Sequence, residues 1–207
     1  MAAPRSPAGK IPDYARWFAI FWLLIWIPAY WHTWGLGNFV QLCDIAVLLT
    51  CIGLWTGSAL LISSQAISSI LIDAAWALDA GWRLFSGHHL TGGTEYLFDP
   101  QYPLPVRMLS LYHLAMPVIL LWALSRLGYD RRGLQLQCAI VPLSFVAARF
   151  ESPQKNMNFA FTDPFFHQSW GYAPVHVAVS IVFMIVVVYY PTALLLRRFL
   201  PPRVSGS

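Results

Sequence analysis

Charged side chains are scarce in this chain. Aspartate, glutamate, lysine and arginine together make up 11% of its 207 residues, whereas hydrophobic residues make up 57%. A soluble globular domain carries roughly 25% charged residues. The composition therefore excludes an ordinary soluble domain and predicts an all-α, polytopic membrane protein whose apolar helices cross a bilayer.

Cysteine is scarce as well. The three cysteines, Cys43, Cys51 and Cys138, lie inside apolar segments and show no CxxC spacing. This pattern argues against a disulfide framework and a structural zinc site, and it predicts small buried side chains. The chain also lacks HxxxH and HExxH spacings, so the sequence predicts no metal site.

Runs of lysine and arginine are missing too, although the formal net charge is +4. Without such a run no nucleic-acid partner is expected, and the basic residues of a membrane protein report its topology instead. The sequence shows no internal repeat and no second domain. We expect one transmembrane domain over residues 13–199, a disordered cytoplasmic tail at residues 1–12 and a second cytoplasmic tail at residues 200–207.

Long apolar runs, by contrast, are abundant, and many tryptophans flank them, as in an interfacial aromatic belt. The run over residues 38–83 is too long for one crossing, and Gly57 supplies a turn that divides it. The basic N-terminus resembles the start of a signal peptide, but no small-residue cleavage site follows, so we predict a retained first span. The six predicted spans cover residues 16–34, 38–55, 59–83, 107–126, 134–150 and 173–196.

The basic residues orient these six spans. An even number of crossings puts both termini on one side, and placing them in the cytoplasm gives nine basic residues inside and four outside, as the positive-inside rule favours. The two long loops, residues 84–106 and 151–172, then face outward from a bacterial inner membrane. The inner set is Arg5, Lys10, Arg16, Arg126, Arg131, Arg132, Arg197, Arg198 and Arg203, and the outer set is Arg83, Arg107, Arg149 and Lys155.

The span at residues 59–83 is unusually polar, because it contains four serines, a glutamine and two aspartates. At 100° per residue an arc of about 140° holds Gln65, Ser68, Ser69, Asp73, Trp76 and Asp79, opposite a face of leucine, isoleucine and alanine. Lipid cannot hydrogen-bond such an arc. It must therefore face the bundle interior or a water-filled cavity.

Two aspartates and one histidine are predicted to share a depth in the membrane. Asp44 lies six residues below Asn38, Asp73 six below Asp79 and His113 six below Arg107, which is about 9 Å in each case. Asn38, Asp79 and Arg107 are expected near one membrane interface. An aspartate that orients His113 makes its imidazole a general base, so these three are the candidate catalytic residues. The candidate substrate-binding residues are Asp79, Arg83, Arg107 and His176, and the arginines suit a lipid headgroup phosphate.

Plainer interpretations stay open. Intramembrane Asp and His often serve helix packing, as do serines. The aromatic segment 150–172 is either an interfacial anchor or a lid over the cavity. Haem would need two facing histidines, and His113 with His176 is the plausible pair. If the outer loops converge, the potential metal ligands are His88, His89, Glu95, Asp99, Asp163 and His167.

Four segments resemble a group of uncharacterised bacterial integral membrane proteins: NFVQLCDIAVLLTCIGLWTG (38–57), LISSQAISSILID (61–73), GGTEYLFDPQYPLP (92–105) and NFAFTDPFFH (158–167). This resemblance covers nearly the whole chain and implies no function. A looser similarity is to six-span intramembrane lipid hydrolases and acyltransferases, which pair a Thr or Cys on an early helix with a later His. It implies Cys43, Thr50 or Cys51 as nucleophile and His113 as base.

The resulting hypothesis is a hydrolase or transferase that acts on a membrane lipid or another amphiphile from the outer leaflet. The sequence identifies no cofactor. One alternative is a non-catalytic membrane subunit or binding protein, as a homo-oligomer or in a larger complex. Another is a small transporter, against which the lack of a repeat and of charged residues along the inner half weighs.

Overall fold

The structure, a computed structural model, describes residues 9–200. Most of the two predicted tails lies outside these residues. Residues 9–12 are described, form no helix and include the buried Ile11. Between residues 9 and 200 the elements are helices and no strand is present, so the predicted all-α class is confirmed.

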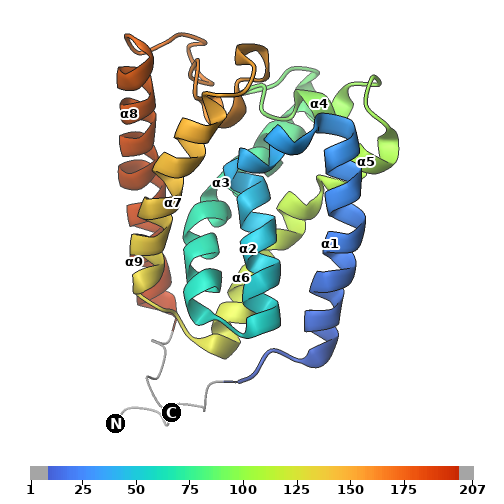
Figure 1. The fold of residues 1–207 in the computed structure, drawn as a ribbon, viewed down its shortest axis with the longest axis vertical. Coiled ribbons are helices and arrows are strands. Elements are labelled where there is room, and N and C mark those ends of the chain that lie inside the picture. The colour runs from blue at the N-terminus through green and yellow to red at the C-terminus, as the bar shows by residue number, and fades with distance from the viewer. Residues whose placement is uncertain (1–8, 201–207) are drawn as a thin grey trace.

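The long helices run side by side along the longest axis of the molecule (Figure 1). The connections before α5 and before α8 gather at one end of the bundle, and the start of α1 and the end of α9 lie at the other. The elements are α1 (Asp13–Trp34), η1 (Leu36–Val40), α2 (Leu42–Thr56), α3 (Ala59–Ser86), α4 (Glu95–Phe98), α5 (Leu104–Leu109), α6 (Tyr112–Leu127), α7 (Arg132–Ala148), η2 (Pro153–Lys155), η3 (Met157–Phe159), α8 (Ala173–Phe183), η4 (Met184–Tyr189) and α9 (Tyr190–Phe199).

Three helical stretches are long and apolar enough to cross a membrane, namely Ala59–Ser86, Leu104–Leu127 and Ala173–Phe199. They coincide with the third, fourth and sixth predicted spans. The apolar helices α2 and α7 have 15 and 17 residues, or about 22 and 25 Å, less than the roughly 30 Å of a hydrocarbon core. Helix α1 has 22 residues, and its tryptophans and tyrosines lower its mean hydropathy. These apolar helices are compatible with a membrane protein.

Three predicted spans differ in detail from the observed helices. The second begins at Leu42, because residues 36–40 form the 3-10 helix η1 and Gln41 is extended. The fourth is divided at residues 110–111, where the backbone turns tighten to i→i+3 hydrogen bonds. The sixth contains a π-helical segment, η4, just before Pro191. Proline lacks the N–H that would close a regular turn, which accounts for this local widening.

Helix α3 lies at the centre, packed against α2, α6 and α7. Its polar arc is buried, from Gln65 through Asp73 to Asp79, so the predicted inward orientation is confirmed. Gln137 of α7 accepts a hydrogen bond from Ser64 at 3.0 Å and donates one to Ser68 at 3.0 Å. These bonds satisfy polar groups that lipid would leave unpaired, and they hold α3 against α7.

Candidate functional site

A buried histidine and aspartate meet between α6 and α3. The Nδ1 atom of His113 lies 2.6 Å from Oδ1 of Asp73, and the two residues are 5% and 2% exposed. Among residues 9–200 the Oδ2 atom of Asp73 has no hydrogen-bond partner. No hydrogen bond joins His113 Nε2 to this part of the chain either. The pair thus has one short internal bond, and the second ring nitrogen makes no hydrogen bond within residues 9–200.

Two aromatic rings enclose the imidazole of His113. Trp76 stacks on one side with its ring centroid at 4.7 Å, and Tyr112 stacks with its centroid at 4.2 Å. The indole of Trp76 is held in turn by a 3.1 Å hydrogen bond to the hydroxyl of Tyr96. Burial raises the pKa of the Tyr96 phenol above its usual range, so that hydroxyl stays protonated. The enclosure fixes the plane of the imidazole and leaves its edge to Asp73.

Asp44 is joined to the pair through Tyr112. The hydroxyl of Tyr112 donates to Asp44 Oδ1 at 3.3 Å, and the amide of Asn38 donates to Asp44 Oδ2 at 2.5 Å. Of the three candidate catalytic residues, the structure therefore brings Asp73 and His113 into direct contact. Asp44 holds the ring that stacks on His113, and no hydrogen bond joins Asp44 to the imidazole within residues 9–200.

The candidate nucleophiles do not touch the base. The thiol of Cys43 points to Gln41 Oε1 at 3.4 Å and to Asp44 Oδ1 at 4.0 Å. Thr50 and Cys51 lie on α2 below this level and line a separate groove. Since no hydroxyl or thiol of the described chain hydrogen-bonds to His113, the arrangement suits activation of a water molecule or of a substrate hydroxyl.

Asp79 anchors the loop that follows α3. Its Oδ1 atom accepts hydrogen bonds from the backbone of Leu90 at 2.6 Å and of Thr91 at 2.7 Å, while its Oδ2 accepts from Thr94 and lies 3.3 Å from His89 Nδ1. Both oxygens are thus engaged by the protein. The contact of Asp79 with substrate stays a prediction, and the structure accounts for this buried carboxylate through loop anchoring alone.

The two candidate headgroup arginines flank the short helix α4. Arg107 donates from Nη1 to the carbonyl of Leu97 at 3.0 Å, and its Nε is buried without a partner among residues 9–200. The guanidinium of Arg83 lies over the ring of Phe98 with its carbon 5.7 Å from the centroid. Both side chains retain N–H groups for an anion at the loop-bearing end of the bundle, and their binding of substrate stays a prediction.

His176, at the start of α8, binds the backbone of the preceding loop with both ring nitrogens. Its Nδ1 accepts from the amide of Trp170 at 3.1 Å, so Nε2 carries the proton and donates to the carbonyl of Phe159 at 2.9 Å. With both nitrogens engaged, His176 offers no free ligand atom to a haem iron, and its contact with substrate stays a prediction. Within residues 9–200 no group of three or more His, Cys, Asp or Glu side chains is arranged to hold a metal ion.

The segment between α7 and α8 is a folded cap. Asn156 accepts hydrogen bonds from the amides of Phe161 at 3.0 Å and Thr162 at 3.1 Å. Asn158 accepts from the amide of Leu42 at 2.9 Å and donates to Ser144. Both asparagines have positive φ, a conformation that asparagine adopts more readily than most residues. These bonds fasten the aromatic segment to the start of α2 and the end of α7.

Asp163 makes the conformation of this cap sensitive to acid. Burial alone would raise its pKa, but the amides of Phe166 at 2.7 Å, Phe165 at 2.9 Å and Gln168 at 3.3 Å outweigh that effect and lower it. A lowered pKa adds stability that is complete above the unfolded value of about 3.9 and is lost as pH falls through the folded value. We expect protection of these amides from hydrogen exchange, corrected for intrinsic rates, to drop as pH is lowered from 6 to 3.

The control for this prediction is Asp163→Asn. Its side chain does not titrate, so protection of the same three amides should be lower at pH 6 and should change little down to pH 3. Equal protection at both pH values in the unaltered protein would show that Asp163 does not hold the cap.

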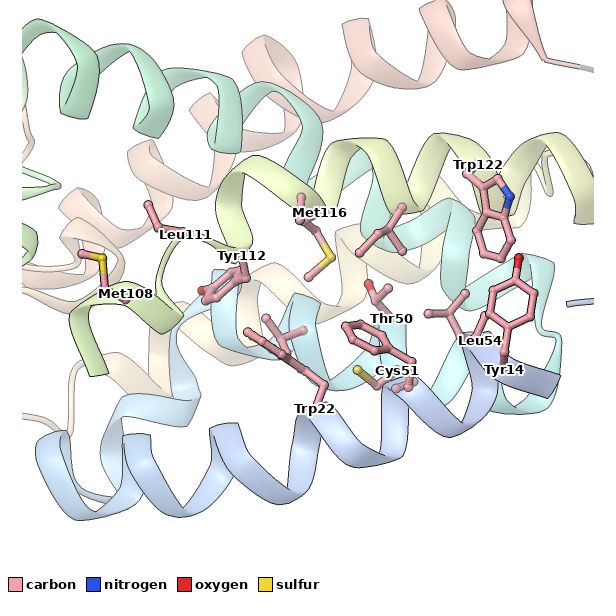
Figure 2. Close-up of a pocket in the computed structure, with 16 residues that line it drawn as sticks. Tyr14, Trp22, Thr50, Cys51, Leu54, Met108, Leu111, Tyr112, Met116 and Trp122 are labelled. Carbon is pink, nitrogen blue, oxygen red and sulfur yellow. The ribbon is translucent and has the colours of Figure 1, made fainter. Parts of the chain in front are cut away.

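An apolar groove of 710 Å³ lies beside the polar cluster, between α1, α2, α5 and α6. Figure 2 shows Tyr14 and Trp122 facing one another at one end of it and Met108 with Leu111 at the other. Tyr112 belongs to both features, because its ring lines the groove and also stacks on His113. His113 and Asp73 do not line the groove themselves.

Sequence reasoning missed three contributors to this cluster, Asn38, Trp76 and Tyr112. Trp76 lies three residues after Asp73, on the same helical face, and this spacing is the signal that could have placed it beside the pair. Asn38 and Tyr112 offered no comparable signal. Comparison of the chain with known protein families, with curated proteins and with solved structures finds no match.

Proposed function

We propose that this protein is a membrane enzyme that hydrolyses a lipid or another amphiphile, or transfers a group from it, with His113 as general base. The observation that supports this proposal is the 2.6 Å contact between His113 Nδ1 and Asp73 Oδ1, together with an Nε2 that makes no hydrogen bond within residues 9–200. An aspartate bound to Nδ1 holds the tautomer whose Nε2 can accept a proton. Asp73 is then a positioning residue.

The proposed topology is a six-span, multi-pass protein of a bacterial inner membrane with both termini in the cytoplasm. The start of α1 and the end of α9 lie at the same end of the bundle, which supports an even number of crossings (Figure 1). The shorter helices α2 and α7 cross as parts of this bundle, packed against α3. Arg126 and Arg132 lie at the same end as the start of α1, as expected for a cytoplasmic face.

The proposed hydrolytic step uses water as the nucleophile. His113 Nε2 removes a proton from water while the water oxygen attacks the carbonyl carbon of an ester, and Asp73 stabilises the imidazolium that forms. As the tetrahedral intermediate collapses, the bond from the carbonyl carbon to the leaving oxygen breaks, and the imidazolium returns its proton to that oxygen. The products are a carboxylic acid and an alcohol, and the imidazole is regenerated. A substrate hydroxyl in place of water makes the same step a transfer.

The level of the pair supports an amphiphilic substrate. By helix rise, His113 lies about 9 Å inside the outer end of its predicted span, within reach of a bond near a headgroup rather than of a freely dissolved molecule. Arg83 and Arg107 lie at the loop-bearing end, where their guanidinium groups suit a headgroup phosphate.

A second candidate function is a non-catalytic binding protein or subunit, in a homo-oligomer or a larger complex. The observation that favours it is the low exposure of both partners, 5% for His113 and 2% for Asp73. A bond so enclosed between α3 and α6 also serves helix packing, which needs no substrate.

The test is turnover of defined amphiphiles by purified protein in lipid nanodiscs. Long-chain 4-nitrophenyl esters and diacyl phospholipids are suitable probes, assayed by nitrophenol release and by mass spectrometry. We expect His113→Gln to lower kcat/KM by about 10²–10⁴, the usual contribution of a general base, without a change in melting temperature. The matched control is His32→Gln on α1, which should retain full activity.

Two results would favour the second candidate instead. One is equal turnover by the His113→Gln variant and the unaltered protein. The other is a loss of turnover that accompanies unfolding of the bundle, since a packing role for His113 explains the loss of activity and the loss of folded protein together.

A further inference from the structure

The apolar groove has a buried floor and an exposed rim. The floor is made by small or apolar side chains such as Ala19, Val47 and Met116, which are 1%, 1% and 6% exposed. The rim carries Tyr14 and Phe18 of α1, which are 70% and 55% exposed. The groove therefore opens sideways, through the wall of the bundle, at the level where the apolar helices run. Because the lining is predominantly apolar, the groove offers water few hydrogen-bonding partners.

The dimensions favour a lipid tail over another helix. Along α6 the groove extends from Leu111 to Trp122, or about 16 Å at 1.5 Å per residue. A helix of that length and about 10 Å in diameter occupies roughly 1,250 Å³, well above the 710 Å³ of the groove. Typical small-ligand sites measure about 300–1,000 Å³. The length is close to half of the roughly 30 Å hydrocarbon core, which is the depth of one leaflet.

One polar atom of the floor is left without a partner. The hydroxyl of Thr50 is buried, is 2% exposed and makes no hydrogen bond within residues 9–200. In Figure 2 it points into the space between α2 and α6. A buried hydroxyl normally bonds to protein, for example to the carbonyl one turn earlier. The Thr50 hydroxyl is therefore a polar atom in the wall of the groove that lacks an internal hydrogen bond.

We infer that the groove holds the hydrocarbon tail of a membrane lipid, with the lipid's polar end directed toward Tyr112. This inference rests on the proposed function, because it names the substrate class of the same site. Tyr112 connects the groove with the His113–Asp73 pair. Its ring lines the groove and stacks on His113 with the centroids 4.2 Å apart, and its hydroxyl donates to Asp44 at 3.3 Å. A tail seated along α6 brings the lipid's linkage to the level of His113. The substrate class is accordingly an acyl lipid that enters from the bilayer.

The inference can be tested by photolabelling, without any need for turnover. The probe is a phosphatidylethanolamine with a diazirine in one acyl tail, diluted into phosphatidylglycerol nanodiscs that contain the purified protein. After illumination, peptide mass spectrometry measures adducts on the floor residues 47–54 relative to adducts on the outward face of α6. We expect floor labelling in the unaltered protein, and a decrease of about tenfold in Ala115→Trp, the factor that 1.4 kcal/mol of lost binding produces.

Ala115 suits this test because it lines the groove from an exposed position, so a larger side chain enters the groove without disturbing the buried core. The matched control is Val118→Trp on the same helix, 68% exposed and outside the groove, and it should leave floor labelling unchanged. Ala115→Leu, a smaller change, should give an intermediate decrease if the tryptophan variant proves unstable. Absence of floor labelling, or equal labelling in Ala115→Trp and Val118→Trp, would overturn the inference.

The photolabelling and turnover experiments fail independently. His113→Gln should keep full floor labelling, because that residue does not line the groove. Turnover that depends on His113 in a protein with an unlabelled floor would reject the tail-binding groove alone. Floor labelling that is lost in Ala115→Trp, with turnover that ignores His113, would reject the proposed enzyme and leave a lipid-binding groove.

Discussion

Asp73→Asn should lower the rate of the proposed reaction by about 10²–10⁴ at neutral pH while the bundle remains folded. A carboxylate only accepts hydrogen bonds, so Asp73 holds the proton on Nδ1 of His113 and leaves Nε2 free. The amide that replaces it carries an NH₂ group, which can face Nδ1 and move the ring proton to Nε2. It also removes the negative charge that stabilises the imidazolium. Both effects disable the base without enlarging or emptying the space between α3 and α6.

The measurement is kcat and KM for the amphiphile on which the unaltered protein is most active, with melting temperature as the check on folding. We expect the loss in kcat, with KM changing little, because Asp73 acts through His113 and does not contact the substrate. The matched control is Asp44→Asn, since Asp44 bonds to Tyr112 and Asn38 rather than to the imidazole. Its effect should stay below about tenfold. Equal losses in both variants would argue against the pair as the centre of the site.

Gly133→Leu should prevent α7 from packing on α3. A Cβ atom added at Gly133 would lie 2.8 Å from Ser63 Cβ and 2.9 Å from backbone atoms of Ser63 and Ser64. Backbone cannot move aside as the end of a long side chain can, so the helices would have to separate. That separation would also break the two hydrogen bonds of Gln137, the one it accepts from Ser64 and the one it donates to Ser68. Overpacking in a core typically costs about 1–3 kcal/mol, and leucine adds three carbons beyond the first clash.

Thermal unfolding in detergent or nanodiscs checks this prediction. For a chain of this size each kcal/mol lowers the melting temperature by roughly 2–4 °C, so Gly133→Ala should lower it by several degrees and Gly133→Leu should yield no folded protein. The control is Gly81→Ala on α3, where an added Cβ meets nothing within 4 Å. Because alanine favours helix over glycine by about 1 kcal/mol, that variant should be at least as stable as the unaltered protein. Normal stability of Gly133→Leu would show that α3 and α7 do not pack this closely.

Helix geometry alone predicted that Asp73, Asp44 and His113 share one level, and it left open which aspartate contacts His113. Rise per residue fixes the depth of a side chain in a helix, and the angle per residue fixes its direction. The polar arc of α3 could face only inward, because lipid offers no hydrogen bonds. Two groups of complementary chemistry at one depth on inward faces then had few other partners. The same argument put Asp44 at this level, but it could not show that the Tyr112 ring stands between Asp44 and the imidazole.

The roles of Asp79 and His176 were not predictable in this way. Both lie near the loop-bearing ends of their helices, where sequence reasoning placed them beside a substrate. In the structure their polar atoms bond to the backbone of loops, Asp79 to Leu90 and Thr91, and His176 to Phe159 and Trp170. Loop conformation depends on turns with left-handed residues such as Asn156 and on contacts between distant segments. Helical periodicity carries no information about either.

By itself, then, the sequence determined the all-α class, the positions of the long apolar helices, the burial of the polar face of α3 and the common depth of Asp44, Asp73 and His113. All of these follow from local rules, namely helix geometry and the cost of polar groups in an apolar medium. Only the tertiary structure decided the aromatic enclosure of His113, the engagement of Asp79 and His176 by loops, and the groove between α1 and α6. Those features depend on how far apart whole helices settle, which is set by side-chain volumes at many contacts together, such as the absence of a side chain at Gly133.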